Sequence, residues 1–514
     1  MQKYDNRLTF FYNLLKYHYK NNAYMEAFIM EWTREKRYLP YSKWDADTLL
    51  HLQAQAANSP YQMHYHLHPI SGLINDPNGF SYFNGEYHLF YQSYPFGAVH
   101  GLKSWVHFKS SDLVNWESLG LAVEPDTMAD SHGAYSGSAR EIDGKLFLMY
   151  TGNHRDENWV RIPYQVGAWM DKNGKVADKT ILFKNPDHIT EHFRDPQILK
   201  QNDTYYAILG AQDKAEKHGH IDVWKSKDLK NWEELGFLDM GTDDLGYMIE
   251  CPNIVRVDGK VVVIFCPQGL DKKVAAYDDI YPNMYVIADD IDWENHKLIN
   301  PGKLHNLDHG FDVYATQAFN APDGNAYEVS WVGLPDTTYP TDDENWANCL
   351  SQVKELHLKS DKLIQTPVKA ISSIRKNEAS ISNQVVSDQA GQQFELELTI
   401  KANQSGTLHL AANNDLSNSL QLNFDTKNGK LVLDRAHAGQ KVAVDYGESR
   451  AITLSPNHDL KLDIFVDHSL IEVFVNDGEK VLTGRYFADQ TNKKIAFAQD
   501  IDYTGKLWQM QTIL

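Results

Sequence analysis

Residues 68–80 read His68-Pro69-Ile70-Ser71-Gly72-Leu73-Ile74-Asn75-Asp76-Pro77-Asn78-Gly79-Phe80, and the rest of the chain is organised around this stretch. An apolar lead-in runs into the turn dipeptides Asp-Pro and Asn-Gly, and an aromatic strand pattern follows. Asp76 is therefore expected where a strand ends or bends. A loop held by a rigid sheet can present such a carboxylate to a pocket. On turn chemistry alone, a hairpin whose Asp caps its own backbone is the commoner outcome.

Short strands separated by turn signals fill the chain from residue 61 to about residue 365. Examples are residues 85–91, 144–150, 204–209 and 259–265, most of which follow a polar turn typical of hairpins. The fragment at 110–116, Ser-Ser-Asp-Leu-Val-Asn-Trp, returns at 226–232 as Ser-Lys-Asp-Leu-Lys-Asn-Trp and loosely at 289–293. Repeats built from strands predict a β-propeller, and the length of the region suits about five blades.

The flanking regions have different patterns. Residues 1–60 form an N-terminal extension, in which 45–58 read as a short helix capped by Asp45 or Asp47, and Met30 resembles a natural protein start. The pattern loosens over 366–384, where we expect a linker. Residues 385–514 alternate apolar and polar side chains, which is typical of a β-sandwich. The predicted fold class is therefore all-β: a five-bladed β-propeller followed by a C-terminal β-sandwich, with a short helical N-terminal segment.

Composition limits the partners of this protein. The 514 residues include 49 Lys and Arg against 69 Asp and Glu, a formal charge of −20, which argues against nucleic-acid and anionic-membrane partners. Cys251, Cys266 and Cys349 have no spacing typical of a disulfide framework or a zinc site. Because the sequence contains neither an apolar run long enough for a membrane span nor a signal-peptide pattern, we expect a cytoplasmic protein. Its oligomeric state is left open.

Two further carboxylates stand in unusual settings. Arg194-Asp195-Pro196 places a cation next to an acid just before a strand, and Glu250 ends an apolar run before Cys251-Pro252. Alone, the first is more often a turn with a surface ion pair and the second a strand end. Acids at positions 76, 195 and 250 could nevertheless come from different blades and point inward at one end of a propeller.

These three motifs, in this order, resemble the acidic motifs of family 32 glycoside hydrolases, the invertases and fructanases. Residues 90–92, 135–138 and 312–315 resemble secondary motifs of that family, and residues 467–478 resemble its C-terminal sandwich. The resemblance covers about residues 31–514. It implies a five-bladed propeller followed by a β-sandwich, and hydrolysis of β-fructosidic bonds with retention of configuration, without a metal or cofactor.

The resemblance also implies roles for individual residues. Asp76 matches the nucleophile at the fructose anomeric carbon, Glu250 the acid/base, and Asp195 the residue that holds two fructose hydroxyls. Arg194 would orient the site. Further contacts to the sugar are expected from Asn75, Gln92, Trp105 and Ser136.

The chemistry sets requirements on two of these acids. Glu250 must hold a proton near neutral pH, and its apolar approach at 247–249 could raise its pKa by disfavouring the charged form. Asp76 must stay ionised, which hydrogen bonds from turn amides would favour. A retaining glycosidase needs both carboxyl groups flanking the scissile bond.

The segment at 96–105 departs from the common invertase pattern. It resembles a cytoplasmic bacterial branch of the family that acts on sucrose 6-phosphate, although enzymes for sucrose and short fructo-oligosaccharides look alike here. A protein this acidic needs a local cation to accept a phosphorylated sugar. Lys103, with His100 nearby, is the candidate phosphate partner at the pocket mouth, and a solvated surface lysine is the alternative.

Two other functions remain open at this point. A fructosyltransferase would use the same three acids with a sugar rather than water as acceptor, and the motifs do not separate the two reactions. A non-catalytic propeller that binds carbohydrate belongs to a different class. The presence of all of Asp76, Asp195 and Glu250 argues against it.

Overall fold

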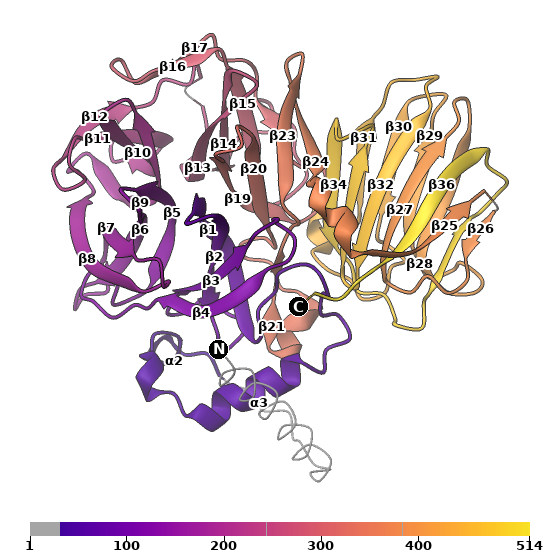
Figure 1. Ribbon diagram of the computed structural model, residues 1–514, viewed down its shortest axis with the longest axis horizontal. Coiled ribbons are helices and arrows are strands. Elements are labelled where there is room, and N and C mark those ends of the chain that lie inside the picture. Colours follow the sequence, from indigo (N-terminus) through magenta and orange to yellow (C-terminus); the bar gives the residue numbers. More distant parts are fainter. Residues whose placement is uncertain (1–30, 243, 383, 514) are drawn as a thin grey trace.

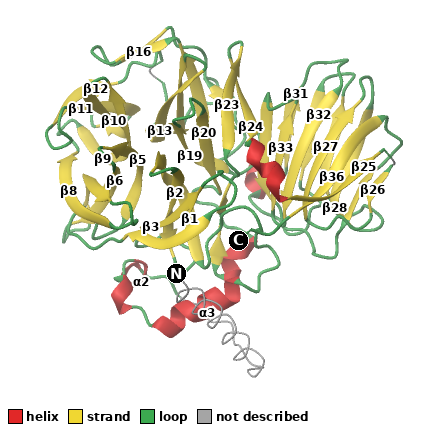
Figure 2. Cartoon of the chain, in the orientation of Figure 1, coloured by secondary structure: helices red, strands yellow, loops and turns green. Residues whose placement is uncertain are grey.

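The computed structural model describes residues 31–242, 244–382 and 384–513 (Figure 1). Within them the chain is mostly β, and the α-helices lie near its start (Figure 2). Residues 1–30, the first half of the extension expected over 1–60, lie outside the described residues. The helix expected over 45–58 is confirmed as α3 (Ala46–Ala56), where the Asp45 side chain accepts the Asp47 N–H at 3.3 Å. It is preceded by α2 (Arg34–Arg37) and the 3-10 turn η1 (Tyr41–Lys43).

Five mainly antiparallel sheets follow one another along the first part of the described chain. The first contains β1 (Gly72–Phe83), β2 (Glu86–Tyr94), β3 (Ser104–Ser110), β4 (Glu117–Val123) and the late strand β21 (Trp346–Ala347). The second contains β5 (Ala134–Ile142), β6 (Lys145–Arg155), β7 (Arg161–Met170) and β8 (Val176–Lys184). The third contains β9 (Ile189–Gln201), β10 (Thr204–Asp213), β11 (Gly219–Ser226) and β12 (Trp232–Phe237).

The last two of these sheets have small additions. The fourth contains β13 (Met248–Val257), β14 (Lys260–Gln268), β15 (Met284–Ala288) and β18 (His305–Asn306), and next to it lies the hairpin β16 (Asp290–Asp292) and β17 (Lys297–Ile299). The fifth contains β19 (Val313–Asn320), β20 (Ala326–Val332), β22 (Cys349–Leu350), β23 (Lys354–Lys359) and β24 (Lys362–Pro367). The 3-10 turn η2 (Pro340–Glu344) precedes β21.

The first strands of the five sheets lie side by side. Each contacts the first strand of the next sheet, and β19 in turn contacts β1. All five strands break register with their neighbour at a similar point, where two residues oppose one: 75–76, 135–136, 195–196, 251–252 and 315–316. A bulge of this kind bends the strand and re-aims its side chains. The five bulges therefore gather side chains from five sheets around one centre.

The C-terminal region is two six-stranded antiparallel sheets, drawn in orange to yellow beside β23 and β24 in Figure 1. One contains β25 (Arg375–Ile381), β36 (Tyr503–Met510), β27 (Gln393–Ile400), β32 (Leu460–Asp467), β33 (Leu470–Val475) and β34 (Lys480–Arg485). The other contains β26 (Val385–Ser387), β35 (Lys494–Phe497), β28 (Ser405–Ala412), β29 (Leu420–Asp425), β30 (Lys430–Asp434) and β31 (Ser449–Thr453). Their alternating apolar residues, such as Leu396, Leu422 and Ile464, form one buried core.

The linker expected over 366–384 is partly wrong. Residues 369–374 form the 3-10 turn η3 (Lys369–Ile374), and β25 is a strand at the edge of the first sandwich sheet, paired with β36. Most residues of β25 are exposed. An edge strand with so little buried apolar surface lacks the alternation by which strands are recognised.

Buried ion pairs join the sandwich to the five sheets. Asp312, just before β19, accepts hydrogen bonds from Arg435 Nη1 at 3.0 Å and from the Arg485 backbone N–H at 2.7 Å. The buried Arg450 also donates from Nη2 to the partly buried Asp279 at 2.6 Å. Removal of one partner of such a buried pair is costly, because the other charge stays desolvated. The sandwich thus fixes the start of β19, which carries one of the bulges.

Candidate active site

Asp76 lies at the bulge of β1 within a network of polar side chains. Its Oδ1 accepts from Asn75 Nδ2 at 3.0 Å, and its Oδ2 accepts from the Ser136 hydroxyl. Gln92 links the two donors: its Oε1 accepts from Asn75 Nδ2 at 3.0 Å, and its Nε2 donates to Ser136 Oγ. The sequence prediction that these four residues belong together is consistent with this geometry, and the network fixes the direction of the Asp76 carboxylate.

Asp195 lies at the bulge of β9 and faces Asp76 across a thiol. Its backbone is in the left-handed region, with φ 64°, as is that of Cys251, with φ 48°. The Cys251 N–H donates to Asp195 Oδ2 at 3.0 Å, and Cys251 Sγ lies 3.6 Å from both Asp195 Oδ2 and Asp76 Oδ2. Strained backbone held in place by surrounding structure is common at functional sites. The bulges here direct two carboxylates at one point.

Glu250 holds the position just before the bulge of β13. Arg194 donates from Nε and Nη2 to its Oε1 at 2.9 and 2.7 Å. Its Oε2 accepts from Gln268 Nε2 at 2.7 Å and from the Tyr314 hydroxyl at 2.6 Å. Arg194 and Tyr314 hold the same position before the bulges of β9 and β19. Three neighbouring strands thus contribute equivalent residues to one hydrogen-bonded group.

The three acids differ in how easily they ionise. Burial raises the pKa of Asp76. The hydrogen bond from Ser136 opposes this increase, and the charge of Glu250 adds to it. Burial likewise raises the pKa of Asp195 to about 7; Arg194 opposes the shift, whereas the charges of Glu250 and Asp76 add to it. Burial also acts on Glu250, but Arg194 and the Tyr314 hydroxyl outweigh it and leave the pKa of Glu250 below its usual value.

The pKa shifts expected from the sequence are therefore wrong in direction for the ligand-free site. The apolar approach to Glu250 was expected to raise its pKa, and turn amides were expected to keep Asp76 ionised. Both shifts run in the opposite direction, because the Arg194 guanidinium bonds to Glu250 while Asp76 and Asp195 lie close to other acids. A like charge nearby disfavours ionisation, and an opposite charge favours it.

Two predicted contact residues lie elsewhere than expected. Trp105 is fully buried among core residues and donates its indole N–H to the Tyr135 carbonyl at 3.0 Å, so its ring has no face open to a sugar. Lys103 is neither at the pocket mouth nor on the surface: it is 3% exposed, and its Nζ donates to Asn75 Oδ1. Burial lowers the pKa of Lys103 to about 7, against the pull of Asp76. The phosphate role expected for Lys103 does not fit this placement.

Sequence reasoning missed several members of the site. Tyr314 was noted only within a family motif, and Gln268, Cys251 and Thr151, which accepts the Asp195 N–H at 3.1 Å, had no assigned role. Among these residues only Tyr314 could have been predicted, because it holds the same position in its strand, directly before the bulge, as Arg194 and Glu250 do in theirs. Gln268 and Thr151 come from second strands, whose pairing cannot be read from the motifs.

Two groups of side chains in the described residues have a spacing that a metal ion could use. Ligand atoms of Asp76, Asp195 and Cys251 lie within 4.8 Å of one another, and so do those of Glu395, Glu397 and Asp463. Burial raises the pKa of the Cys251 thiol, and a protonated thiol is a poor ligand. In the second group Arg375 already pairs with Glu395 and Glu397. Neither group has the chemistry of a committed metal centre.

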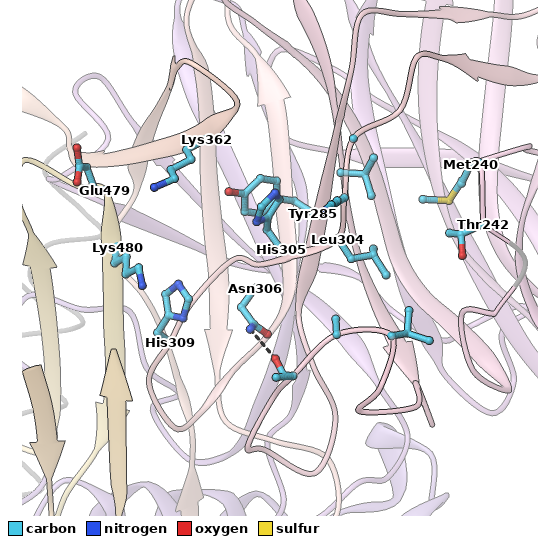
Figure 3. A pocket seen from close by; sticks show the side chains of 17 residues that line it. Met240, Thr242, Tyr285, Leu304, His305, Asn306, His309, Lys362, Glu479 and Lys480 are labelled. Carbon is cyan, nitrogen blue, oxygen red and sulfur yellow. Dashed lines mark hydrogen bonds between the residues drawn. The ribbon is translucent and has the colours of Figure 1, made fainter. Parts of the chain in front are cut away.

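A cleft of about 590 Å³ lies between the fourth sheet and the sandwich, and none of the candidate site residues lines it. Figure 3 shows Tyr285 and His305 on one side, and Lys362, Glu479 and Lys480 on the other. The cleft and the acid group are therefore separate features. No helix in the described part of the chain is long and apolar enough to cross a membrane.

Comparison with known proteins finds two family models and several relatives that match this chain. The model described as "Glycosyl hydrolases family 32 N-terminal domain" matches residues 66–367, and the one described as "Glycosyl hydrolases family 32 C terminal" matches 360–509. The sucrose-6-phosphate hydrolase of Pediococcus pentosaceus is 46% identical over 93% of this chain and 97% of its own length. That of Streptococcus mutans is 48% identical over 88% and 94%.

Solved structures give the same result for the fold. A sucrose-6-phosphate hydrolase from Lactobacillus gasseri superimposes with a TM-score of 0.93 and 60% identity, over 94% of this chain and all of its own. The Bombyx mori β-fructofuranosidase BmSUC1 gives a TM-score of 0.79 and 28% identity, over 91% of this chain and 97% of its own. Such neighbours have an N-terminal propeller and a C-terminal β-sandwich. The chain belongs to glycosyl hydrolase family 32.

Proposed function

We propose that this protein is a retaining β-fructofuranosidase that hydrolyses sucrose 6-phosphate, with sucrose and short fructo-oligosaccharides as further substrates. The observation that carries the proposal is that Asp76 and Asp195 lie on the bulges of β1 and β9, and Glu250 directly before that of β13, so close that their charges interact. The names of the relatives support the choice of substrate, since the match spans nearly their whole length.

We infer that the five sheets from β1 to β24 are the blades of a five-bladed propeller. The contacts of each first strand with the next, and of β19 with β1, support this blade count. The catalytic domain would then end with β24, and the sandwich would begin with β25. Ligand sites at the centre of such a ring draw residues from several blades, which accounts for the wide sequence spacing of the three acids.

The proposed reaction has two steps. In the first, an Asp76 carboxylate oxygen bonds to the anomeric carbon of fructose while the bond to the leaving sugar oxygen breaks, and Glu250 donates its proton to that oxygen. In the second, Glu250 removes a proton from water, whose oxygen bonds to the same carbon and releases Asp76. Asp195, with a pKa of about 7, is suited both to donate to and to accept from fructose hydroxyls.

Glu250 needs a proton for the first step, and the ligand-free site favours its ionised form. The Arg194 guanidinium is the main group that opposes the effect of burial on Glu250. We propose that substrate entry draws Arg194 away from Glu250 Oε1, which raises the pKa of the acid where the proton is needed. Tyr314 and Gln268 would then keep the carboxyl group in place.

The proposed site of action is the cytoplasm. Cys251, Cys266 and Cys349 are all free and buried, as is usual for proteins of a reducing compartment. A phosphorylated disaccharide is charged and stays in the compartment where it is made.

Product analysis tests the function. Purified protein is incubated with sucrose 6-phosphate, sucrose and 1-kestose, and free fructose is measured. The proposal predicts fructose from all three, with the highest kcat/KM for sucrose 6-phosphate. Accumulation of longer oligosaccharides instead of fructose at high sucrose concentration would make the enzyme a transferase, and no turnover of any β-fructoside would refute the proposal.

A further inference from the structure

Two arginines face each other on the hairpin between β6 and β7. Arg155 ends β6, Arg161 begins β7, and the two residues are directly opposite in register. The turn that joins them holds Trp159 in the left-handed region, with φ 66°. A positive φ is unusual for a bulky side chain and points to a constrained turn. The hairpin therefore places two guanidinium groups side by side in a defined geometry.

Neither guanidinium has a carboxylate partner. In the described parts of the chain no Asp or Glu lies within ion-pair distance of Arg155 or Arg161, and the buried Nε atom of each has no hydrogen-bond acceptor. The nearest acid in sequence, Asp156, is occupied by its own turn, since its Oδ1 accepts from the Asn158 and Val160 amides at 2.9 and 2.8 Å. Arg155 Nη1 donates only to the Trp159 carbonyl, at 2.9 Å. Within the described residues, these two positive charges have no anionic partner, although the protein has a net charge of −20.

Aromatic rings hold the cations in place. The Arg155 guanidinium carbon lies 5.1 Å from the Trp159 ring centroid, and that of Arg34 from α2 lies 4.5 Å from the same ring. Arg161 lies 5.8 Å from the Tyr135 ring. Tyr38 packs edge-on against Trp159, with 5.2 Å between centroids. These ring contacts already restrict the arginine side chains. Anion binding would therefore cost less side-chain entropy.

The pair lies next to the acid group. Tyr135, under Arg161, is the residue before Ser136, which bonds to Asp76. Burial lowers the pKa of Arg161, and the positive charges of Arg194 and Arg155 lower it further, so Arg161 is within electrostatic reach of the arginine that binds Glu250. Glu250 marks the side of the leaving sugar in the proposed reaction. A charged group on that sugar would therefore be directed toward Arg161.

We propose that Arg155 and Arg161 form the subsite for the phosphate of the leaving sugar, and so determine the preference for the phosphorylated substrate. This inference rests on the proposed function. A guanidinium matches the phosphate oxygens with paired N–H donors, which a lysine cannot do. The pair also supplies the local cation that an acidic protein needs to accept an anionic substrate, the role that buried Lys103 does not fill.

The test compares two substrates in matched variants. The measured quantity is the ratio of kcat/KM for sucrose 6-phosphate to kcat/KM for sucrose. Arg161→Gln and Arg155→Gln should each lower this ratio at least about tenfold, the effect of one lost charged contact. Arg161→Lys, which keeps the charge, should lower it less. Lys362→Met removes a cation in the separate cleft of Figure 3 and should leave the ratio unchanged.

A binding experiment distinguishes recognition of the sugar phosphate from recognition of free phosphate. Calorimetric titration with glucose 6-phosphate, glucose and inorganic phosphate should give the tightest binding for glucose 6-phosphate, and Arg161→Gln should remove that advantage over glucose. Binding of inorganic phosphate alone would overturn the assignment to the leaving sugar. If folded variants lost kcat/KM equally for both substrates, the arginines would have a structural role and not a role in phosphate binding. A wild type with equal kcat/KM for sucrose and sucrose 6-phosphate would refute the subsite, whereas no hydrolysis of either would refute the proposed function.

Discussion

Asp195 and Asp467 are both buried acids, yet their surroundings differ. Asp467, in the sandwich strand β32, accepts the backbone N–H groups of His64, Tyr65 and His66 at 2.8, 2.8 and 3.0 Å, and the His66 ring at 3.0 Å. Burial alone would raise the pKa of Asp467, but His468 and His66 outweigh it, and the pKa lies well below the usual value. Asp195 accepts one backbone N–H, and its pKa is raised to about 7.

The difference shows that burial by itself does not identify a reactive acid. Asp467 has enough donors to be fixed in its charged form, and it connects the segment before β1 to the sandwich. Asp76 and Asp195 have fewer donors and lie near other acids, so the pKa of each is raised. The regular ladder of β32 and the bulge of β9 produce these two outcomes, because a bulge directs side chains toward a centre rather than into a packed layer.

The largest expected effect is that of Asp76→Asn on turnover. The amide keeps the shape and cannot form the glycosidic ester, so kcat for sucrose should fall by about 10⁴-fold. The melting temperature should stay the same or rise, since the folded protein disfavours the ionised form of this acid. Steady-state kinetics and calorimetry check the two parts. A variant that loses activity because it unfolds would contradict the contrast with Asp467.

Asp467→Asn is the converse change. It should lower the free energy of unfolding by about 3 kcal/mol or more, because three amides and a histidine lose a buried charged acceptor. Urea denaturation measures this change. The folded fraction should keep kcat near that of the wild type. A large fall in kcat with unchanged stability would place Asp467 in the catalytic machinery.

How much of this contrast the sequence could predict depends on the residue. The three acids stand in recognisable motifs, so Asp76, Asp195 and Glu250 could be found, as could the alternation of the sandwich. The directions of their pKa shifts could not be found, because Arg194 and Glu250 meet only through the side-by-side packing of β9 and β13. From its sequence neighbours Lys103 is expected to be a phosphate partner at the pocket mouth or a solvated lysine, since its burial and its bond to Asn75, 28 residues earlier, form only in the folded chain.

The pH dependence of stability provides a third test, on the partner of Asp467. Burial lowers the pKa of His66, but hydrogen bonds to Asp467 and Glu472 raise it overall to about 9. The charged His66 therefore contributes stability that is fully present below its unfolded pKa of about 6.5 and is lost as pH rises toward about 9. The stability advantage of the wild type over His66→Gln should shrink by roughly 3 kcal/mol between pH 6 and pH 10. A constant difference would show that His66 is neutral in the folded protein.

Lys103→Met should have the smallest effect. Lys103 Nζ bonds to Asn75, which orients Asp76, so the loss should lower kcat by about tenfold. Sucrose and sucrose 6-phosphate should be affected equally, because the lysine lies behind the nucleophile. Kinetics with both substrates measure this. A loss confined to the phosphorylated substrate would restore the phosphate role for Lys103 and weaken that of Arg155 and Arg161.

The central claim is that Asp76, and not its neighbour Asp195, forms the covalent bond to fructose. Glu250→Ala, treated with a fructoside whose leaving group needs no proton, should form the ester and then hydrolyse it slowly, since the base for the second step is missing. Mass spectrometry of the intact protein should show one added fructosyl group, and peptide mapping should place it on Asp76. The Glu250→Ala/Asp76→Asn double variant should stay unlabelled. A label on Asp195, or none under conditions of turnover, would contradict the account.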